Sequence, residues 1–285
     1  MTRPPRILLF DSGLGGLTVA RAARAVLPDA HYLYGADNAA FPYGGWDEPR
    51  LVERIVAVMG RLIAEARPDI VVVACNTAST LALARLREAY TVPFVGTVPA
   101  IKPAAELTQS RIIGVLATPG TVNREYTQIL IHTFAHHCHV ILHGAQHLAG
   151  LAEAKLKGAA PDLAAIAEEI RPVFRRRDAR CTDTVVLGCT HYPLLLPELQ
   201  AASPWPVAFI DPAPAIARRV ASVVAALPES PLGAERAPGG TVFFTSASGL
   251  APASLAVYTE EKFARPVVLE PSGETQLVSN MRSPC

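Results

Sequence analysis

The stretch that decides the fold is Ile70-Val-Val-Val-Ala-Cys-Asn-Thr-Ala-Ser79, and it has a counterpart in Thr184-Val-Val-Leu-Gly-Cys-Thr-His-Tyr-Pro193. In each stretch an apolar, β-branched run leads to a cysteine, Cys75 or Cys189, and a polar segment able to open a helix follows. Open α/β sheets bind their ligands at the carboxyl ends of such strands. The sequence therefore predicts two thiols at two strand ends of an α/β protein.

Outward from the cysteines, strand-like and helical segments alternate, which indicates βαβ units and mainly parallel sheets. The pattern restarts in the second half of the chain. The loop at Asp11 is matched at Thr118, 107 residues later, and Cys75 is matched by Cys189, 114 residues later. Two similar offsets suggest an internal repeat of a whole α/β half. Two such halves facing each other bring both cysteines to one cleft.

We therefore expect two pseudosymmetric α/β domains with the active site in the cleft between them. The first domain is predicted to comprise residues 1–97 together with 212–270, and the second residues 98–211. Residues 227–240 read as a Pro/Gly-rich connecting loop, residues 163–176 as a helix, and residues 271–285 as a disordered tail.

Composition narrows the class of protein. The 285 residues are 50% hydrophobic and 18% charged, with a net charge of +1, which is typical of a globular protein without an electrostatic footprint for nucleic acid. No apolar run reaches the ~18 residues of a membrane span, and the residues before the first strand lack the apolar core and cleavage site expected of a signal peptide. We expect a cytoplasmic protein, with no membrane or nucleic-acid partner, whose five cysteines are free thiols.

The neighbours of the two cysteines favour chemistry over simple burial. Asn76 and Thr77 are helix-capping residues that leave backbone N–H groups to hold an anion, and a helix N-terminus favours the thiolate. Thr190 and His191 follow Cys189 in the same way, and His191 can relay protons. The remaining cysteines lack such neighbours and read as structural.

Other segments carry weaker signals. Asp11-Ser-Gly-Leu-Gly-Gly16 reads as a tight turn and lacks a nucleotide-binding pattern. The carboxylate of Asp11 can nevertheless hold an amine or orient a thiol. Pro42-Tyr-Gly-Gly45 offers backbone donors for a carboxylate. Six of the eight histidines lie between His132 and His147, and their rings are expected to point in different directions rather than to bind a metal. No cofactor motif is present, so we expect neither a cofactor nor a metal.

In combination, Asp11-Ser-Gly-Leu-Gly-Gly-Leu17, Phe41-Pro-Tyr-Gly44, Ala74-Cys-Asn-Thr-Ala-Ser79 and Gly188-Cys-Thr-His-Tyr-Pro-Leu194 resemble the successive signature segments of the glutamate racemases. The resemblance covers roughly residues 6–225. It implies a cofactor-independent racemase that interconverts L- and D-glutamate, supplies D-glutamate for peptidoglycan, and can form a homodimer. It further implies that Cys75 and Cys189 flank Cα of glutamate, one as thiolate base and the other as thiol acid.

By the same resemblance, Asp11 assists Cys75, and His191 assists Cys189. Glu153 falls where the family has an acid that supports the second cysteine, although its flanking residues differ from the family pattern. The residues implied in binding the amino and carboxylate groups of the substrate are Ser12, Pro42, Tyr43, Gly44, Asn76, Thr77, Thr118, Thr121 and Thr190.

Three alternatives stay open at this point. One is another two-cysteine racemase or isomerase, acting on aspartate or a hydantoin. A second is a Cys-His hydrolase with Cys75 as nucleophile, which does not need Cys189. The third is a binding protein that holds glutamate without exchanging its Cα proton.

Overall fold

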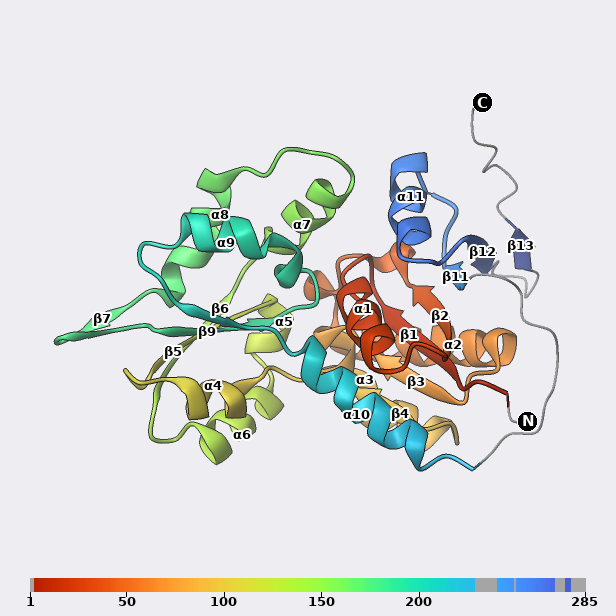
Figure 1. Ribbon diagram of the computed structural model, residues 1–285, viewed down its shortest axis with the longest axis horizontal. Helices are drawn as coiled ribbons and strands as arrows, with labels where there is room; N and C mark the ends of the chain where they lie inside the picture. The colour runs from red at the N-terminus through yellow and green to blue at the C-terminus, as the bar shows by residue number, and fades with distance from the viewer. Residues whose placement is uncertain (1–2, 229–239, 249, 270–274, 278–285) are drawn as a thin grey trace.

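The computed structural model describes residues 3–228, 240–248, 250–269 and 275–277. It contains a larger and a smaller sheet, each covered by helices on both faces (Figure 1). The larger sheet has seven strands in the order β13-β12-β11-β2-β1-β3-β4, parallel except for the β12–β13 pair. These strands are β1 (Arg6–Asp11), β2 (His31–Ala36), β3 (Ile70–Val73), β4 (Phe94–Gly96), β11 (Thr241–Phe244), β12 (Arg265–Leu269) and β13 (Thr275–Leu277).

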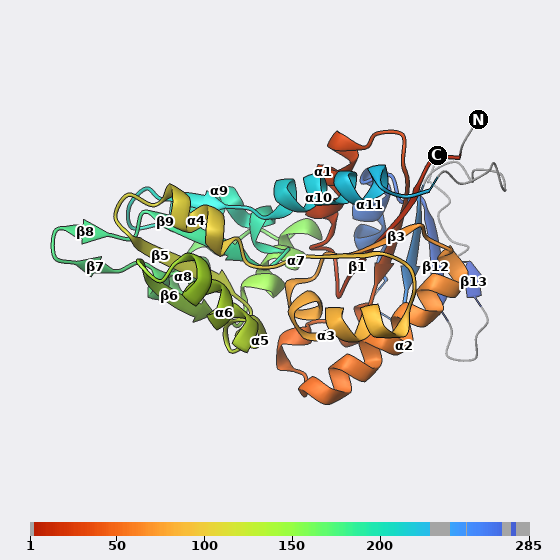
Figure 2. The same cartoon turned by 90° about the horizontal axis from the view of Figure 1, so that it is seen from below.

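The central strands of this sheet are apolar on both faces because helices cover both. β3 reads Ile-Val-Val-Val and is fully buried, as expected of a parallel strand between two helical layers. One core cluster packs under α1, α10 and α11, and the other under α2 and α3 (Figure 2). These helices are α1 (Leu17–Val26), α2 (Glu48–Ala66), α3 (Asn76–Ala89), α10 (Ala213–Ala225) and α11 (Pro252–Glu260).

The smaller sheet has four parallel strands in the order β10-β9-β5-β6. Helices α7, α8 and α9 pack on one face, and α4 and α6 on the other (Figure 1). The strands are β5 (Ile112–Ala117), β6 (His139–Gly144), β9 (Thr184–Gly188) and β10 (Ala208–Ile210). The helices are α4 (Ile101–Leu107), α5 (Pro119–Val122), α6 (Glu125–Phe134), α7 (Leu148–Leu156), α8 (Leu163–Ile170) and α9 (Leu196–Ala202), and short 3₁₀ turns occupy η1 (Asn38–Ala40), η2 (Tyr43–Gly45), η3 (Arg171–Val173) and η4 (Tyr192–Leu195).

The two sheets repeat one topology. The order β2-β1-β3-β4 in the larger sheet corresponds to β6-β5-β9-β10 in the smaller one. Cys75 follows β3 and Cys189 follows β9, so the two cysteines occupy equivalent positions. The predicted fold class, two pseudosymmetric α/β halves with mainly parallel sheets, is confirmed. The domain limits at 97/98 and 211/212 stay predictions.

Two sequence expectations are wrong in part. The helix predicted over 163–176 ends at Ile170, because Pro172 lacks the N–H that a continuing helix needs. The chain then forms a projecting antiparallel hairpin of β7 (Arg176–Arg177) and β8 (Arg180–Cys181), seen at the left of Figure 1.

The predicted disordered tail also contains regular structure. Residues Thr275–Leu277 form β13, because the edge of β12 offers unpaired backbone groups to an antiparallel partner. The rest of that tail, and most of the 227–240 connection, lie outside the described residues. Within the described ranges, no helix is both long and apolar enough to cross a membrane.

Candidate active site

Both predicted thiols line one small cavity between the two halves. Cys75 is the N-cap of α3, and Cys189 lies in the turn between β9 and η4. Each side chain is buried, with a residue exposure of 6%. The expected neighbours that line the same cavity are Ser12, Pro42, Tyr43, Gly44, Asn76, Thr77, Thr118, Thr190 and His191. Asp11, Thr121 and Glu153 lie behind this lining and contact members of it.

The surroundings of Cys75 keep it protonated. Burial and the charge of Asp11 raise the pKa of the Cys75 thiol well above its usual range. Ser12 Oγ lies 4.0 Å from Cys75 Sγ, and the backbone N–H of Ala78, in the first turn of α3, opposes the shift only in part. Cys75 is therefore a buried cysteine that is held in its thiol form.

Asp11 ends β1 and reaches across to the other half. Its carboxylate accepts a hydrogen bond from Gly13 N (2.9 Å) and one from Thr190 Oγ1 (2.9 Å). Burial raises the pKa of Asp11, against the lowering effect of His191 and of these hydrogen bonds. Asp11 therefore couples the Cys75 loop to the residue that follows Cys189.

The surroundings of Cys189 are different, because a histidine and an acid lie in series behind it. His191 Nδ1 is 3.8 Å from Cys189 Sγ, and His191 Nε2 is 3.2 Å from Glu153 Oε1. Burial lowers the pKa of His191, but hydrogen bonds to Cys189 and Glu153 raise it more, to about 10. An imidazolium beside a cysteine sulfur stabilises the thiolate form, which is the form that accepts a proton.

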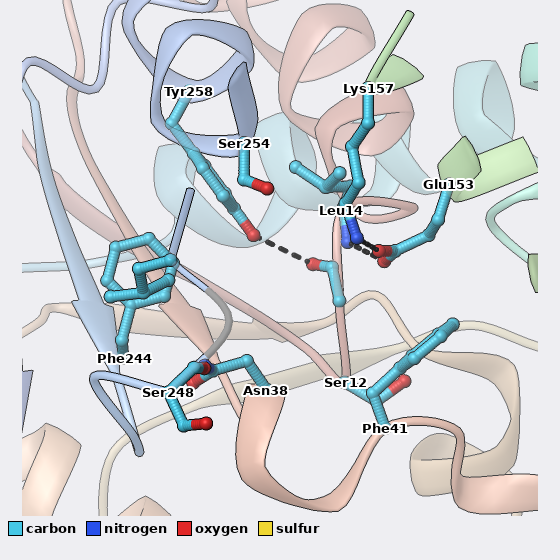
Figure 3. A pocket seen from close by; sticks show the side chains of 12 residues that line it. Ser12, Leu14, Asn38, Phe41, Glu153, Lys157, Phe244, Ser248, Ser254 and Tyr258 are labelled. Atoms are coloured by element: carbon cyan, nitrogen blue, oxygen red, sulfur yellow. Dashed lines mark hydrogen bonds and ion pairs between the residues drawn. The ribbon is translucent and has the colours of Figure 1, made fainter. Parts of the chain in front are cut away.

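Glu153 lies on α7, at the position that the resemblance assigned to a supporting acid. Oε1 accepts a hydrogen bond from Leu14 N (2.9 Å), and Oε2 is 2.7 Å from Lys157 Nζ (Figure 3). Burial raises the pKa of this carboxyl, but His191, Lys157 and Leu14 N together lower it to about 2. The sequence analysis missed Lys157, which lies four residues after Glu153 and could have been found had α7 been predicted.

Asn76 is the clearest donor and acceptor available to a ligand. Its side chain is buried and lines the cavity, yet neither Nδ2 nor Oδ1 has a hydrogen-bond partner among the described residues. A buried amide without partners costs stability, of the order of 1–3 kcal/mol. A polar ligand in the cavity would restore those hydrogen bonds.

Hydroxyl groups join the two halves on the same side of the cavity. Thr77 Oγ1 lies 3.0 Å from Thr118 Oγ1 and 3.4 Å from Thr121 Oγ1. Thr118 and Thr121 hydroxyls are 3.0 Å apart. Thr121 is fully buried and supports Thr118 from behind, so only Thr77 and Thr118 face the cavity.

The loop containing Pro42, Tyr43 and Gly44 is held by a buried acid whose role the sequence analysis did not recognise. Asp37 accepts hydrogen bonds from Tyr43 Oη (2.7 Å) and from Arg54 Nη2 (2.6 Å). Arg54 Nε donates another at 2.8 Å, and Thr245 Oγ1, directly after β11, donates a fourth at 2.6 Å. Asp37 therefore ties this loop of the cavity to α2 and β11.

A second cavity adjoins the first behind Ser12 and Phe41, which line both (Figure 3). Glu153 and Lys157 lie on one wall, and Ser254 and Tyr258 of α11 on another.

In the histidine-rich segment the rings of His136 and His137 meet edge to face, with their centroids 5.2 Å apart. The described residues contain no group of three or more His, Cys, Asp or Glu side chains suited to a metal ion.

Comparison with known proteins gives the family. The model of the Asp/Glu/Hydantoin racemase family matches residues 17–220. Glutamate racemase of Brucella anthropi is 58% identical over 219 residues, which are 76% of this chain and 79% of the relative. The crystal structure of Escherichia coli glutamate racemase in complex with L-glutamate and activator UDP-MurNAc-Ala is 44% identical, with a TM-score of 0.85, over 93% of this chain and 97% of that one.

A more distant likeness is found among the solved structures. Allantoin racemase from Klebsiella pneumoniae is 25% identical, with a TM-score of 0.51, over 82% of this chain and 95% of that one. Matches of this extent, at 58% identity to a curated relative, show that this chain belongs to the Asp/Glu/hydantoin racemase family.

Proposed function

We propose that this protein is a glutamate racemase, which interconverts L- and D-glutamate by proton exchange at Cα between Cys75 and Cys189. The observation that carries the proposal is the placement of two buried thiols at equivalent strand ends of two pseudosymmetric sheets, in one cavity. The activity of the Brucella relative and the L-glutamate in complex with the Escherichia coli enzyme support glutamate as substrate.

The reaction begins with one cysteine as thiolate and the other as thiol. The thiolate removes the Cα proton of the bound enantiomer, forming S–H as the Cα–H bond breaks, and the electron pair moves onto the α-carboxylate. The opposite thiol then gives its proton to the other face of Cα. The two cysteines have exchanged roles, and proton exchange with water or a reverse turnover resets them.

The Cα–H of an amino acid is a very weak acid, so the carbanion needs fixed donors as much as the reaction needs a base. The unpartnered Asn76 amide and the Thr77 and Thr118 hydroxyls are suited to the substrate carboxylates. Backbone N–H groups at the start of α3 and in the Pro42–Gly44 loop add further donors. Asp11, Ser12 and Thr190 lie where an ammonium group can be held near Cys75.

The asymmetric surroundings give each thiol a starting state. Burial and Asp11 favour Cys75 as the acid, whereas the Glu153–His191 pair favours Cys189 as the thiolate. Conversion of one enantiomer starts from this state, and conversion of the other starts from the reverse state.

In a cell the product D-glutamate would serve peptidoglycan synthesis. We further propose that the enzyme acts in the cytoplasm, where reducing conditions keep both thiols free. We also propose that it forms the homodimer expected from the resemblance. Size-exclusion chromatography with light scattering measures the assembly directly.

The substrate test compares glutamate with the substrates of the alternatives. Optical rotation is followed with L-glutamate, L-aspartate and a 5-substituted hydantoin such as allantoin at equal concentration. We expect loss of rotation with glutamate alone. Inversion of aspartate or the hydantoin, without inversion of glutamate, overturns the assignment.

A further inference from the structure

Lys157 contacts the relay behind Cys189 without lining the cavity that holds the thiols. It is the C-cap of α7, one turn after Glu153, and its Nζ is 2.7 Å from Glu153 Oε2. Its side chain is 42% exposed, whereas that of Glu153 is 10% exposed. Figure 3 shows Lys157 and the Leu14 amide approaching the Glu153 carboxylate together. Lys157 therefore brings a positive charge from the surface to a buried acid.

Oε1 of Glu153 faces Nε2 of His191, which has one hydrogen-bond acceptor and one donor as neighbours. His191 Nε2 lies 3.2 Å from Glu153 Oε1, which accepts hydrogen bonds, and 3.2 Å from Gly15 N, which donates one. The carboxylate is satisfied when Nε2 carries a proton, and the Gly15 amide when Nε2 does not. The position of the Glu153 carboxylate therefore decides between two tautomers of neutral His191.

The tautomer matters because the opposite nitrogen faces Cys189. With the proton on Nε2, the Nδ1 lone pair can accept the Cys189 proton and later return it. With the proton on Nδ1, the neutral ring has no lone pair to offer the sulfur. Exchange with Cys189 requires the tautomer that an ionised Glu153 favours.

We propose that Lys157 is a positioning residue of the proposed racemisation, which anchors Oε2 of the Glu153 carboxylate so that Oε1 faces His191, and thereby keeps the proton of neutral His191 on Nε2. Its effect is electrostatic and local, because a partly exposed ion pair adds little to overall stability. The inference rests on the proposed function for its kinetic consequence but not for its structural one.

Other groups also act on the Glu153–His191 pair. The titratable side chains that face it are Asp11 from β1, Tyr34 from β2, Tyr258 from α11 and Cys189. Asp11 raises the pKa of His191, as Glu153 and Cys189 do. Among the described residues facing the pair, Lys157 is the cation that contacts Glu153.

The test compares Lys157→Met with Lys157→Arg and with Lys155→Met as a matched control. Met removes the charge but keeps an unbranched chain, and Arg restores the charge. Lys155 lies on the same helix but binds Glu198 and the Leu194 carbonyl. Thermal melting checks that each variant is folded.

The first measurement is ¹⁵N NMR of the His191 imidazole, assigned with His191→Gln and recorded above its pKa of about 10, where the ring is mostly neutral. We expect protonated Nε2 in the wild type, Lys157→Arg and Lys155→Met, and a larger fraction of the Nδ1–H tautomer in Lys157→Met. An unchanged tautomer in Lys157→Met overturns the inference, whatever the activity of the protein.

The second measurement is the pH profile of kcat/KM with glutamate. Enantiomers have equal free energies in water, so kcat/KM is equal from either side and one direction suffices. For Lys157→Met we expect kcat/KM to fall by about two- to fivefold, the range of a partly exposed charge interaction. The alkaline limb should move about half a pH unit lower, because a less firmly held Glu153 carboxylate raises the pKa of His191 less. Lys157→Arg should restore both.

The outcomes separate the two claims. A wild type without racemase activity sinks the proposed function and leaves the NMR arm to judge Lys157. An active wild type with an unmoved pH limb in Lys157→Met contradicts the positioning role, even if that variant melts at a lower temperature.

Discussion

The two thiol sites have the same topology and opposite electrostatics. Cys75 and Cys189 follow equivalent strands of two sheets with matching strand order. Cys75 is held as a thiol by burial and by the charge of Asp11. Cys189 instead faces an imidazole whose other nitrogen contacts a carboxylate.

The difference shows how a repeated fold can serve a reaction that needs an acid and a base at once. The repeat brings two thiols to one cavity, and the residues around each thiol break the symmetry between them. A symmetric pair would have no preferred proton distribution. The surroundings hold the proton on Cys75 and place an imidazole beside Cys189.

The largest expected effect on activity comes from removing the sulfur at either of the two thiol sites. Cys75→Ser and Cys189→Ser should each lower kcat/KM by about a thousandfold or more, because a hydroxyl is a much weaker base than a thiolate and general acid–base catalysis carries about 10²–10⁴ of the rate. Polarimetry with glutamate measures this.

Cys138→Ser is the matched control, because Cys138 lies outside the cavity lining and should keep wild-type activity. Turnover that survives in Cys189→Ser but not in Cys75→Ser would favour a hydrolase with a single nucleophile.

The next effect concerns the Cys189 side alone. His191→Gln should lower kcat by about a hundredfold, since it removes a general acid–base group while keeping a polar side chain of similar length. The primary isotope effect from 2-deuterated glutamate should rise in the direction that starts with Cys189 as base. An equal isotope effect from both enantiomers would contradict separate roles for the two sides.

A smaller effect concerns the Cys75 side. Asp11→Asn keeps an oxygen for the Gly13 amide and removes the charge that raises the pKa of Cys75. The pKa of Cys75 should fall, so that the thiol loses its proton within the alkaline range and kcat there falls by about tenfold. The kcat profile above pH 7 records the shift, and an unmoved alkaline limb would exclude Asp11 as its cause.

The smallest effect is on stability. The pKa of His191 is raised to about 10 from its usual 6.5. The protonated ring therefore contributes fully to the free energy of unfolding below pH 6.5, and this contribution is lost as the pH rises towards 10. Urea unfolding from pH 6.5 to 9.5 should show a steeper loss of stability in the wild type than in His191→Gln. The exposed His132→Gln is the control and should follow the wild type; identical slopes in all three would refute the coupling.

Much of this arrangement could be predicted from the sequence. The β-branched runs before Cys75 and Cys189 predicted two strand ends, and the two offsets predicted a repeat that the strand orders confirm. The capping residues Asn76 and Thr77 predicted a helix start at the cavity. Local patterns sufficed because each feature depends on neighbours in the chain.

What the sequence did not reveal depends on distant contacts. The bond from Leu14 N to Glu153 joins residues 139 apart, and the bonds from Arg54 and Thr245 converge on Asp37 from different elements. The prediction of a helix over 163–176 did not take account of Pro172, and the helix ends at Ile170. Helix α7 was not predicted, so the pairing of Glu153 with Lys157 on consecutive turns was missed. The different electrostatic surroundings of the two thiols follow from burial and charge in three dimensions.

The most direct test of the two-thiol account is to follow L-glutamate in D₂O by ¹H NMR and mass spectrometry during the first few per cent of conversion. With a separate acid on the far face of Cα, every D-glutamate formed carries deuterium at Cα, while unreacted L-glutamate keeps its proton. Deuterium entering L-glutamate as fast as D-glutamate forms, or D-glutamate that retains the substrate proton, would contradict proton transfer by two thiols on opposite faces.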